Sequence, residues 1–207
     1  MLLVTSVTQH KRECAQLLTA RLLTSDHNHN SLLVEFGTDQ IDIPRWPYLH
    51  PLGQLKILKE PSLYAQSKTT EKQSYRFLWM RSFHELVSIR FDLQSDGKAM
   101  ITVKKGTGTA EAFSTQLARG YRRMLTQEQS KWFLDEVRQS DFWNLVGHQD
   151  PDDDGVSDGA RWVIEGTKDR RYHVVDRWSP ESGPVRTLGL ALAIELAQMK
   201  MSAQQIY

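Results

Sequence analysis

The stretch from Tyr75 to Leu93 constrains the fold most, because its side chains follow a period of two. Such alternation is typical of β-strands, in which successive side chains point to opposite faces of a sheet. The apolar positions are Tyr75, Phe77, Trp79, Phe83, Val87, Ile89, Phe91 and Leu93. Since the pattern breaks at Arg81 and Glu85, it predicts two strands joined by a bend or bulge, with one side of the ribbon in the core.

Turn residues then predict two β-hairpins. Ser95–Lys98 supplies turn chemistry, and the alternation from Ala99 to Lys104 predicts a strand that returns along the first pair. Farther on, two runs rich in β-branched and aromatic residues, 160–165 and 171–178, flank the polar, glycine-containing connection 166–170. If that loop has an even number of residues, the register pairs Arg161 with Asp176 and Ile164 with His173. The sequence thus predicts an antiparallel sheet.

Two helices are expected in the second half of the chain. Thr126 with Gln129 three residues later resembles a capping box, and the helix behind it has a buried stripe of Phe133, Leu134 and Val137. Residues 185–199 are apolar on most of a helical circumference, which predicts a well-buried helix. The order of strands, helix, hairpin and helix indicates an α+β fold, an antiparallel sheet built from hairpins with two helices packed on one face.

The first part of the chain has a different pattern. Residues 1–24 predict a short strand and a helix, residues 32–36 a strand, and the proline-containing stretch 44–61 an irregular connection. The polar residues 68–74 resemble a linker. We therefore expect an N-terminal α/β appendage at 1–72 and a main α+β domain at 73–201.

Composition limits the class of protein. Among 207 residues, 40% are hydrophobic and 25% charged, which is typical of a globular chain that folds without a required metal or cofactor. The 26 Lys and Arg residues nearly balance the 25 Asp and Glu residues, so no overall field favours nucleic acid.

Cys14 is the only cysteine, and an intramolecular disulfide is thereby excluded. The first residues lack the features of a secretory signal, and the most apolar segment, 188–197, is shorter than the roughly 20 residues that a membrane-spanning helix needs. We therefore expect a soluble, cytoplasmic protein without a membrane partner.

One acidic loop matches part of a calcium-binding motif. It places Asp150, Asp152, Asp154 and Asp158 at positions 1, 3, 5 and 9 of the motif, with Gly155 at position 6. Carboxylate oxygens suit a hard cation such as Ca²⁺. However, position 12 is Arg161 instead of the bidentate glutamate, and turns select Asp and Gly in any case. The alternatives are a divalent-ion site and a solvated acidic turn.

No complete catalytic motif is present. A phosphate-binding loop and a nucleophile elbow are both missing from the sequence. If the chain is an enzyme, the candidate catalytic residues are His84, which falls at the strand break, and His173, Asp176 and Arg177 in the second hairpin. His173 and Asp176 are three apart on one strand and therefore point to opposite faces, and Arg161 offers Asp176 a structural ion pair.

Four segments together resemble a group of uncharacterised bacterial proteins. They are Tyr75–His84, Phe142–Trp143, Asp158–Trp162 and Tyr172–Pro180. The resemblance covers about residues 74–200 and implies a bacterial source and a domain boundary near residue 72. It carries no activity, substrate or catalytic residue over to this chain.

The sequence leaves two functions open. A well-patterned sheet, balanced charge and many aromatic residues favour a non-enzymatic module that binds another protein, as an inhibitor, immunity-type or accessory factor, since Trp and Tyr often anchor interfaces. The alternative is a divalent-metal-dependent hydrolase that uses the loop from Asp150 to Asp158. The oligomeric state stays open.

Overall fold

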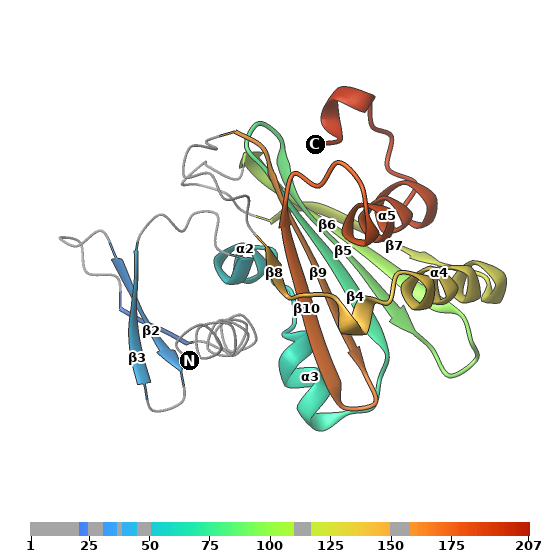
Figure 1. Cartoon of the computed structure of the whole chain (residues 1–207), viewed down its shortest axis with the longest axis horizontal. Coiled ribbons are helices and arrows are strands. Elements are labelled where there is room, and N and C mark those ends of the chain that lie inside the picture. Colours follow the sequence, from blue (N-terminus) through green and yellow to red (C-terminus); the bar gives the residue numbers. More distant parts are fainter. Residues whose placement is uncertain (1–20, 25–30, 37–38, 45–50, 110–116, 150–157) are drawn as a thin grey trace, which may run out of the picture.

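The computed structural model describes residues 21–24, 31–36, 39–44, 51–109, 117–149 and 158–207. Its main body is the predicted α+β architecture, in which helices pack on an antiparallel sheet (Figure 1). A separate sheet of three antiparallel strands forms from the N-terminal segment: β1 (Arg21–Thr24), β2 (Ser31–Phe36) and β3 (Asp39–Pro44).

Six antiparallel strands build the main sheet, in the order β7-β6-β5-β4-β9-β10. The two-residue strand β8 (His148–Gln149) extends it, parallel to β10. The bounds are β4 (Ser74–Arg81), β5 (Glu85–Leu93), β6 (Ala99–Thr109), β7 (Leu117–Met124), β9 (Ala160–Lys168) and β10 (Arg171–Trp178). The predicted break between 81 and 85 is confirmed, because β4 ends at Arg81 and β5 begins at Glu85.

One face of the sheet carries the larger core. The odd-numbered aromatic residues of β4 pack there under α4 (Gln127–Gln139), η2 (Phe142–Asn144), α5 (Pro184–Leu190) and the π-helix η3 (Ala191–Leu196) (Figure 1). Buried Phe133 and Val137 anchor α4, and the predicted capping box between Thr126 and Gln129 is present. The two helices expected on this face are therefore confirmed.

The opposite face is covered as well. Two short helices, α2 (Pro51–Ile57) and α3 (Leu63–Thr69), pack there against a smaller core that includes Leu78, Met80 and Val174 (Figure 1). Every residue of β4 is therefore buried, including Arg76 at an even position of the alternating pattern. The sheet is the middle layer between two sets of helices.

The second hairpin forms with a different register from the one predicted. Its strands continue to Lys168 and resume at Arg171, so the loop is only Asp169 and Arg170, both with positive φ. Such two-residue turns match the twist of paired strands. As a result Asp176 lies opposite Val163 and His173 opposite Gly166. The predicted partners of Asp176 and His173 were wrong by two residues.

Several elements differ from the sequence prediction. The stretch expected to be irregular contains α2, since proline is favoured in the first turn of a helix. Residues 21–24, expected at the end of a helix, form β1. Strand β7, an exposed edge strand without apolar alternation, was not expected from the sequence. The last predicted helix starts as α5 and continues as a π-helix.

Candidate functional site

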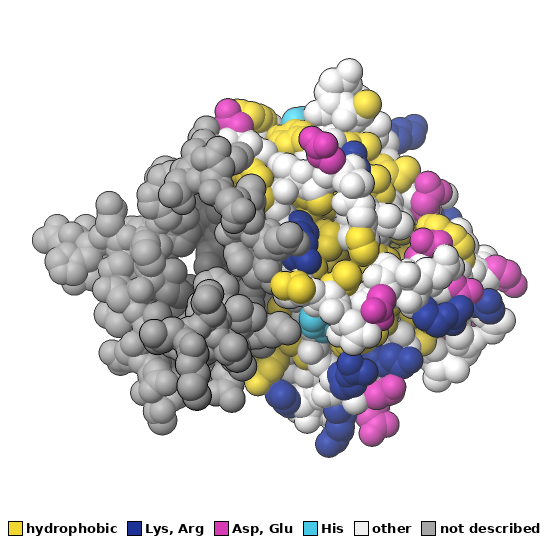
Figure 2. All heavy atoms as spheres, in the orientation of Figure 1, with side chains coloured by type: hydrophobic (Ala, Val, Ile, Leu, Met, Phe, Trp, Pro, Cys, Tyr) yellow, Lys and Arg dark blue, Asp and Glu magenta, His cyan; other side chains and the backbone are white. Residues whose placement is uncertain are grey.

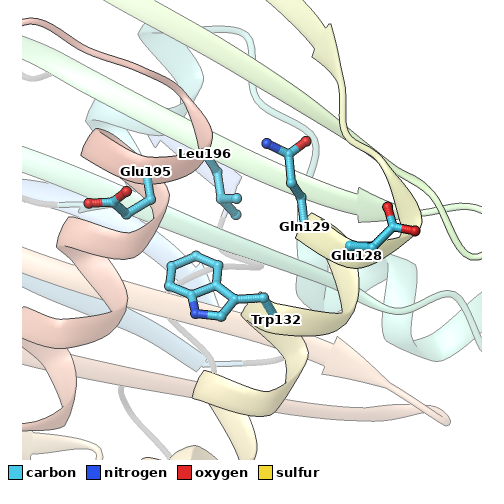
Figure 3. A pocket seen from close by; sticks show the side chains of 5 residues that line it. All are labelled: Glu128, Gln129, Trp132, Glu195 and Leu196. Carbon is cyan, nitrogen blue, oxygen red and sulfur yellow. The ribbon is translucent and has the colours of Figure 1, made fainter.

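A groove with a volume of about 320 Å³ lies between α4 and η3. Its lining residues are Glu128, Gln129, Trp132, Glu195 and Leu196. In Figure 3 the indole of Trp132 extends from α4 toward η3, where Glu195 and Leu196 lie. Trp132 is 39% exposed, whereas Leu196 is buried. The groove therefore combines an apolar floor, a half-covered aromatic wall and two carboxylates.

The helical periodicity of α4 determines which of its side chains face the groove. Phe133 points into the core, so Trp132 falls at the boundary between the buried and the exposed side of the helix. Glu128 and Glu136 are four residues before and after Trp132, and they lie one turn away on the same side. Two carboxylates of α4 thus flank the indole.

The opposite wall is a π-helix held in place by strand β7. The Tyr121 hydroxyl donates to the carbonyl oxygen of Ala197 at 2.6 Å, and Arg123 donates through Nη1 to that of Leu196 at 2.9 Å. These bonds satisfy carbonyl groups at the end of η3. Because π-helical turns frequently occur at functional sites, the irregular helix also favours a functional role for this groove.

The described lining of the groove contains two carboxylates and no Lys or Arg side chain. Lys131 and Arg138, the basic residues of α4, both pair with Asp135 at 2.9 Å. Hydrogen bonding with the Thr126 side chain, followed by that with its own backbone N–H, lowers the pKa of Glu128, which is therefore ionised at neutral pH. Acidic, basic and hydrophobic side chains lie close together over the region of α4 and α5 in Figure 2. The groove is suited to bind an apolar group accompanied by positive charge.

His84, predicted at the strand break, lies beside the C-terminal segment. Its Nδ1 shares a hydrogen bond of 2.9 Å with the Tyr207 hydroxyl, which also accepts one from the backbone N–H of Phe83. Burial, then the charge of Arg81, lowers the pKa of His84. Arg81 is itself buried, and burial lowers its pKa to about 10. The sequence indicated the histidine but not its partner.

His173 lies at the other end of the sheet. It lies opposite Gly166 on strand β9. Arg81, which is close to His84 in the chain, lies opposite Ala160 on the same strand. Ala160 and Gly166 are six residues apart on β9, which corresponds to about 20 Å at roughly 3.3 Å per residue. The His173 ring packs with its edge on Phe142, with centroids 5.1 Å apart. The structure does not bring the two histidines together.

The remaining catalytic candidates have structural contacts. Asp176 forms an ion pair with Arg161 at 3.3 Å, although the two residues are diagonal instead of opposite. The Arg177 guanidinium donates to the carbonyl oxygens of Val146 at 2.8 Å and of Gly147 at 3.3 Å, and these bonds tie β10 to the segment before β8. Asp176 and Arg177 are neighbours on one strand, so their side chains point to opposite faces.

Three residues of the predicted metal loop, Asp150, Asp152 and Asp154, lie outside the described residues. Asp158 is described and exposed. It precedes Gly159, whose carbonyl oxygen accepts hydrogen bonds from the backbone and the side chain of Ser82. Within the described part of the chain, no group of three or more His, Cys, Asp and Glu residues is placed to hold a metal ion.

Sequence reasoning missed a buried charge cluster on the face covered by α2 and α3. The Glu60 carboxylate lies 2.9 Å from Arg90 Nη1, 3.1 Å from Lys104 Nζ and 3.6 Å from Arg76 Nη1. Arg76 also donates through Nε to Glu165 Oε2 at 2.6 Å and through Nη1 to the carbonyl oxygen of Pro61 at 2.7 Å. These contacts fasten the α2–α3 connection to the sheet. An arginine at an even position of an alternating strand is also what a solvent-exposed face carries, so the local pattern gave no signal of this burial.

Comparisons with known proteins do not place the chain in a family: no family model matches it, and no curated protein shows significant similarity to it. Among the helices of the described residues, none is both long and apolar enough to span a membrane.

Proposed function

We propose that this chain is a non-enzymatic protein-binding module and that the groove between α4 and η3 is its docking site. The expected partner segment places one large apolar side chain in the groove and carries Lys or Arg residues on either side of it. Half-exposed Trp132, flanked by carboxylates, is the observation that supports this proposal most directly.

The proposal rests on the balance of desolvation and charge. An indole that is already half covered loses its remaining hydration when an apolar partner side chain packs on it, and Trp is among the most frequent interface anchors. Glu128 and Glu195 line the groove, and Glu136 is one helical turn from Trp132; these carboxylates favour a basic segment and disfavour an acidic one. Charge at the rim thereby selects the partner, while the apolar floor provides most of the affinity.

A binding assay with defined peptides tests the proposal. The probe is a fluorescently labelled helical peptide of leucine and lysine, and its counterpart has glutamate in place of lysine. Anisotropy titration should show binding of the lysine peptide alone, weakened several-fold by added salt because rim charges are screened. Trp132→Ala should weaken binding at least about tenfold, the size of effect expected for an interface anchor.

Matched variants separate the groove from general acidity. Glu195→Gln removes a carboxylate that lines the groove, and Glu71→Gln removes an exposed one between α3 and β4, outside the groove. We expect weaker binding for the first variant and unchanged binding for the second. Equal effects of the two, or full binding by a folded Trp132→Ala protein, would contradict the groove as the site.

A further inference from the structure

Two buried tryptophans donate hydrogen bonds to the same oxygen atom. The indole N–H of Trp162 lies 2.8 Å and that of Trp79 3.2 Å from the main-chain oxygen of Tyr207. Both indoles are fully buried, and their centroids are 4.8 Å apart. Since an indole N–H can only donate, this pair requires an acceptor at one fixed point.

A guanidinium extends this set of donors. Arg81 donates through Nη1 to the carbonyl oxygen of Gln205 at 3.0 Å, and its guanidinium stacks 4.2 Å from the ring centroid of Trp79. The Tyr207 ring packs 5.5 Å from His84, and its hydroxyl meets the backbone N–H of Phe83 at 3.1 Å. The end of the sheet therefore offers donors for main-chain acceptors and a place for one aromatic ring.

The donors and the segment that they hold differ in burial. With the segment in place, Trp79 and Trp162 are 0% exposed and Arg81 is 4% exposed, and all three belong to the paired strands β4 and β9. Residues 202–207 are exposed or half-exposed, and their regular structure is the single short turn η4 (Ala203–Gln205). Deeply buried donors are thus met by a segment that lies closer to the surface.

We propose that Trp79, Arg81 and Trp162 form a peptide-binding site and that residues 203–207 are its resident ligand. The bound segment must have an aromatic residue whose main-chain oxygen accepts hydrogen bonds from both indoles. Two residues before it, a carbonyl oxygen must accept a hydrogen bond from Arg81. A peptide of this chemistry from another molecule competes with the resident segment. This site is independent of the groove between α4 and η3.

The contacts explain why such a site stays filled. Removal of the segment would leave two indole N–H groups buried without an acceptor, and Arg81 would keep only its bond from Nη2 to the carbonyl oxygen of Glu85 at 3.2 Å, which is unfavourable. A tethered segment has an effective concentration on the order of millimolar, so an outside peptide must overcome that competition. Only main-chain acceptors and one ring are recognised, and many peptide sequences with a suitably placed Tyr therefore qualify.

Competition between the two segments is measurable. The probe is a labelled peptide with the sequence of residues 202–207, titrated into the full chain and into a variant that lacks 203–207. We expect the shortened variant to bind the peptide at least about tenfold more tightly than the full chain, given the millimolar tether. The same peptide with alanine in place of its tyrosine should bind more weakly.

A second variant and a second measurement keep the test decisive. Full-length Tyr207→Ala keeps the main-chain acceptor but loses the ring, so it should also bind the tyrosine peptide more tightly than the original chain. In the unmodified chain, the indole N–H groups of Trp79 and Trp162 should exchange with solvent through local release of the segment. A folded variant without peptide binding, or exchange of both indoles only on global unfolding, would overturn the proposal.

Discussion

The guanidinium of Arg76 on β4 and the carboxylate of Glu165 on β9 form an ion pair in which both side chains are buried. The two residues are 89 positions apart in the chain but lie opposite each other in the register of the strands. The Tyr172 hydroxyl donates to the other carboxylate oxygen at 2.7 Å. Because α2 and α3 cover this face, water does not replace these contacts when one partner is lost.

Loss of one member of this pair should destabilise the protein strongly. Glu165→Gln leaves the Arg76 charge without its main counterion, and we expect unfolding to become easier by about 3 to 5 kcal/mol. The double variant Arg76→Met, Glu165→Leu removes both charges and should be less affected than the single one. Urea unfolding followed by circular dichroism measures the difference. A single variant as stable as the unmodified chain would contradict the role of the pair.

Glu60 should control the attachment of the α2–α3 connection. Its carboxylate is contacted by Arg76, Arg90 and Lys104, and Glu60→Ala leaves these three cations facing one another. We expect a larger increase in amide hydrogen exchange in α2 and α3 than in β4 and β5, because the connection loses three ionic contacts with the sheet and keeps only the bonds to its carbonyl oxygens. Glu71→Ala, which removes an exposed carboxylate near the same segment, is the control and should leave the exchange pattern unchanged. Uniformly faster exchange would instead indicate a general loss of stability.

The hairpins and the capped helix were predictable because local signals determine them. Alternation specifies a half-buried strand, and the capping box at Thr126 specifies where α4 begins, with no need for distant residues. The order of these elements then restricts the architecture to helices on an antiparallel sheet. The predicted fold class was therefore confirmed.

Tertiary contacts decide the features that the sequence did not reveal. Strand β7 is stabilised by pairing with β6, and its exposed basic sequence lacks the alternation of a half-buried strand. Burial of Glu60 and Arg76 depends on α2 and α3 folding over the sheet. The groove at Trp132 requires α4 and η3 to meet, and local periodicity cannot place two helices relative to each other.

Two helical glycines should respond in opposite ways to alanine. A Cβ atom on Gly189 in α5 would lie 2.6 Å from Cζ3 of Trp162, a ring held in the core, whereas one on Gly53 in α2 would meet nothing within 4 Å. We expect Gly189→Ala to destabilise the protein by about 1 to 3 kcal/mol through overpacking. Gly53→Ala should be neutral or stabilising by up to about 1 kcal/mol, because alanine favours the helix. Thermal melting compares the two variants.

The folded protein should disfavour protonation of His84. Burial, followed by the charge of Arg81, lowers its pKa below 6.5 in the folded state, so the unfolded chain binds the proton more readily. The stability that the neutral ring contributes is therefore fully present above about pH 6.5 and is lost as the pH falls through the folded-state pKa. Titration of the His84 ring by NMR should show a midpoint below 6.5, which Arg81→Met raises and Arg81→Lys leaves nearly unchanged. A midpoint at or above 6.5 in the unmodified chain would show that neither burial nor Arg81 acts on this ring.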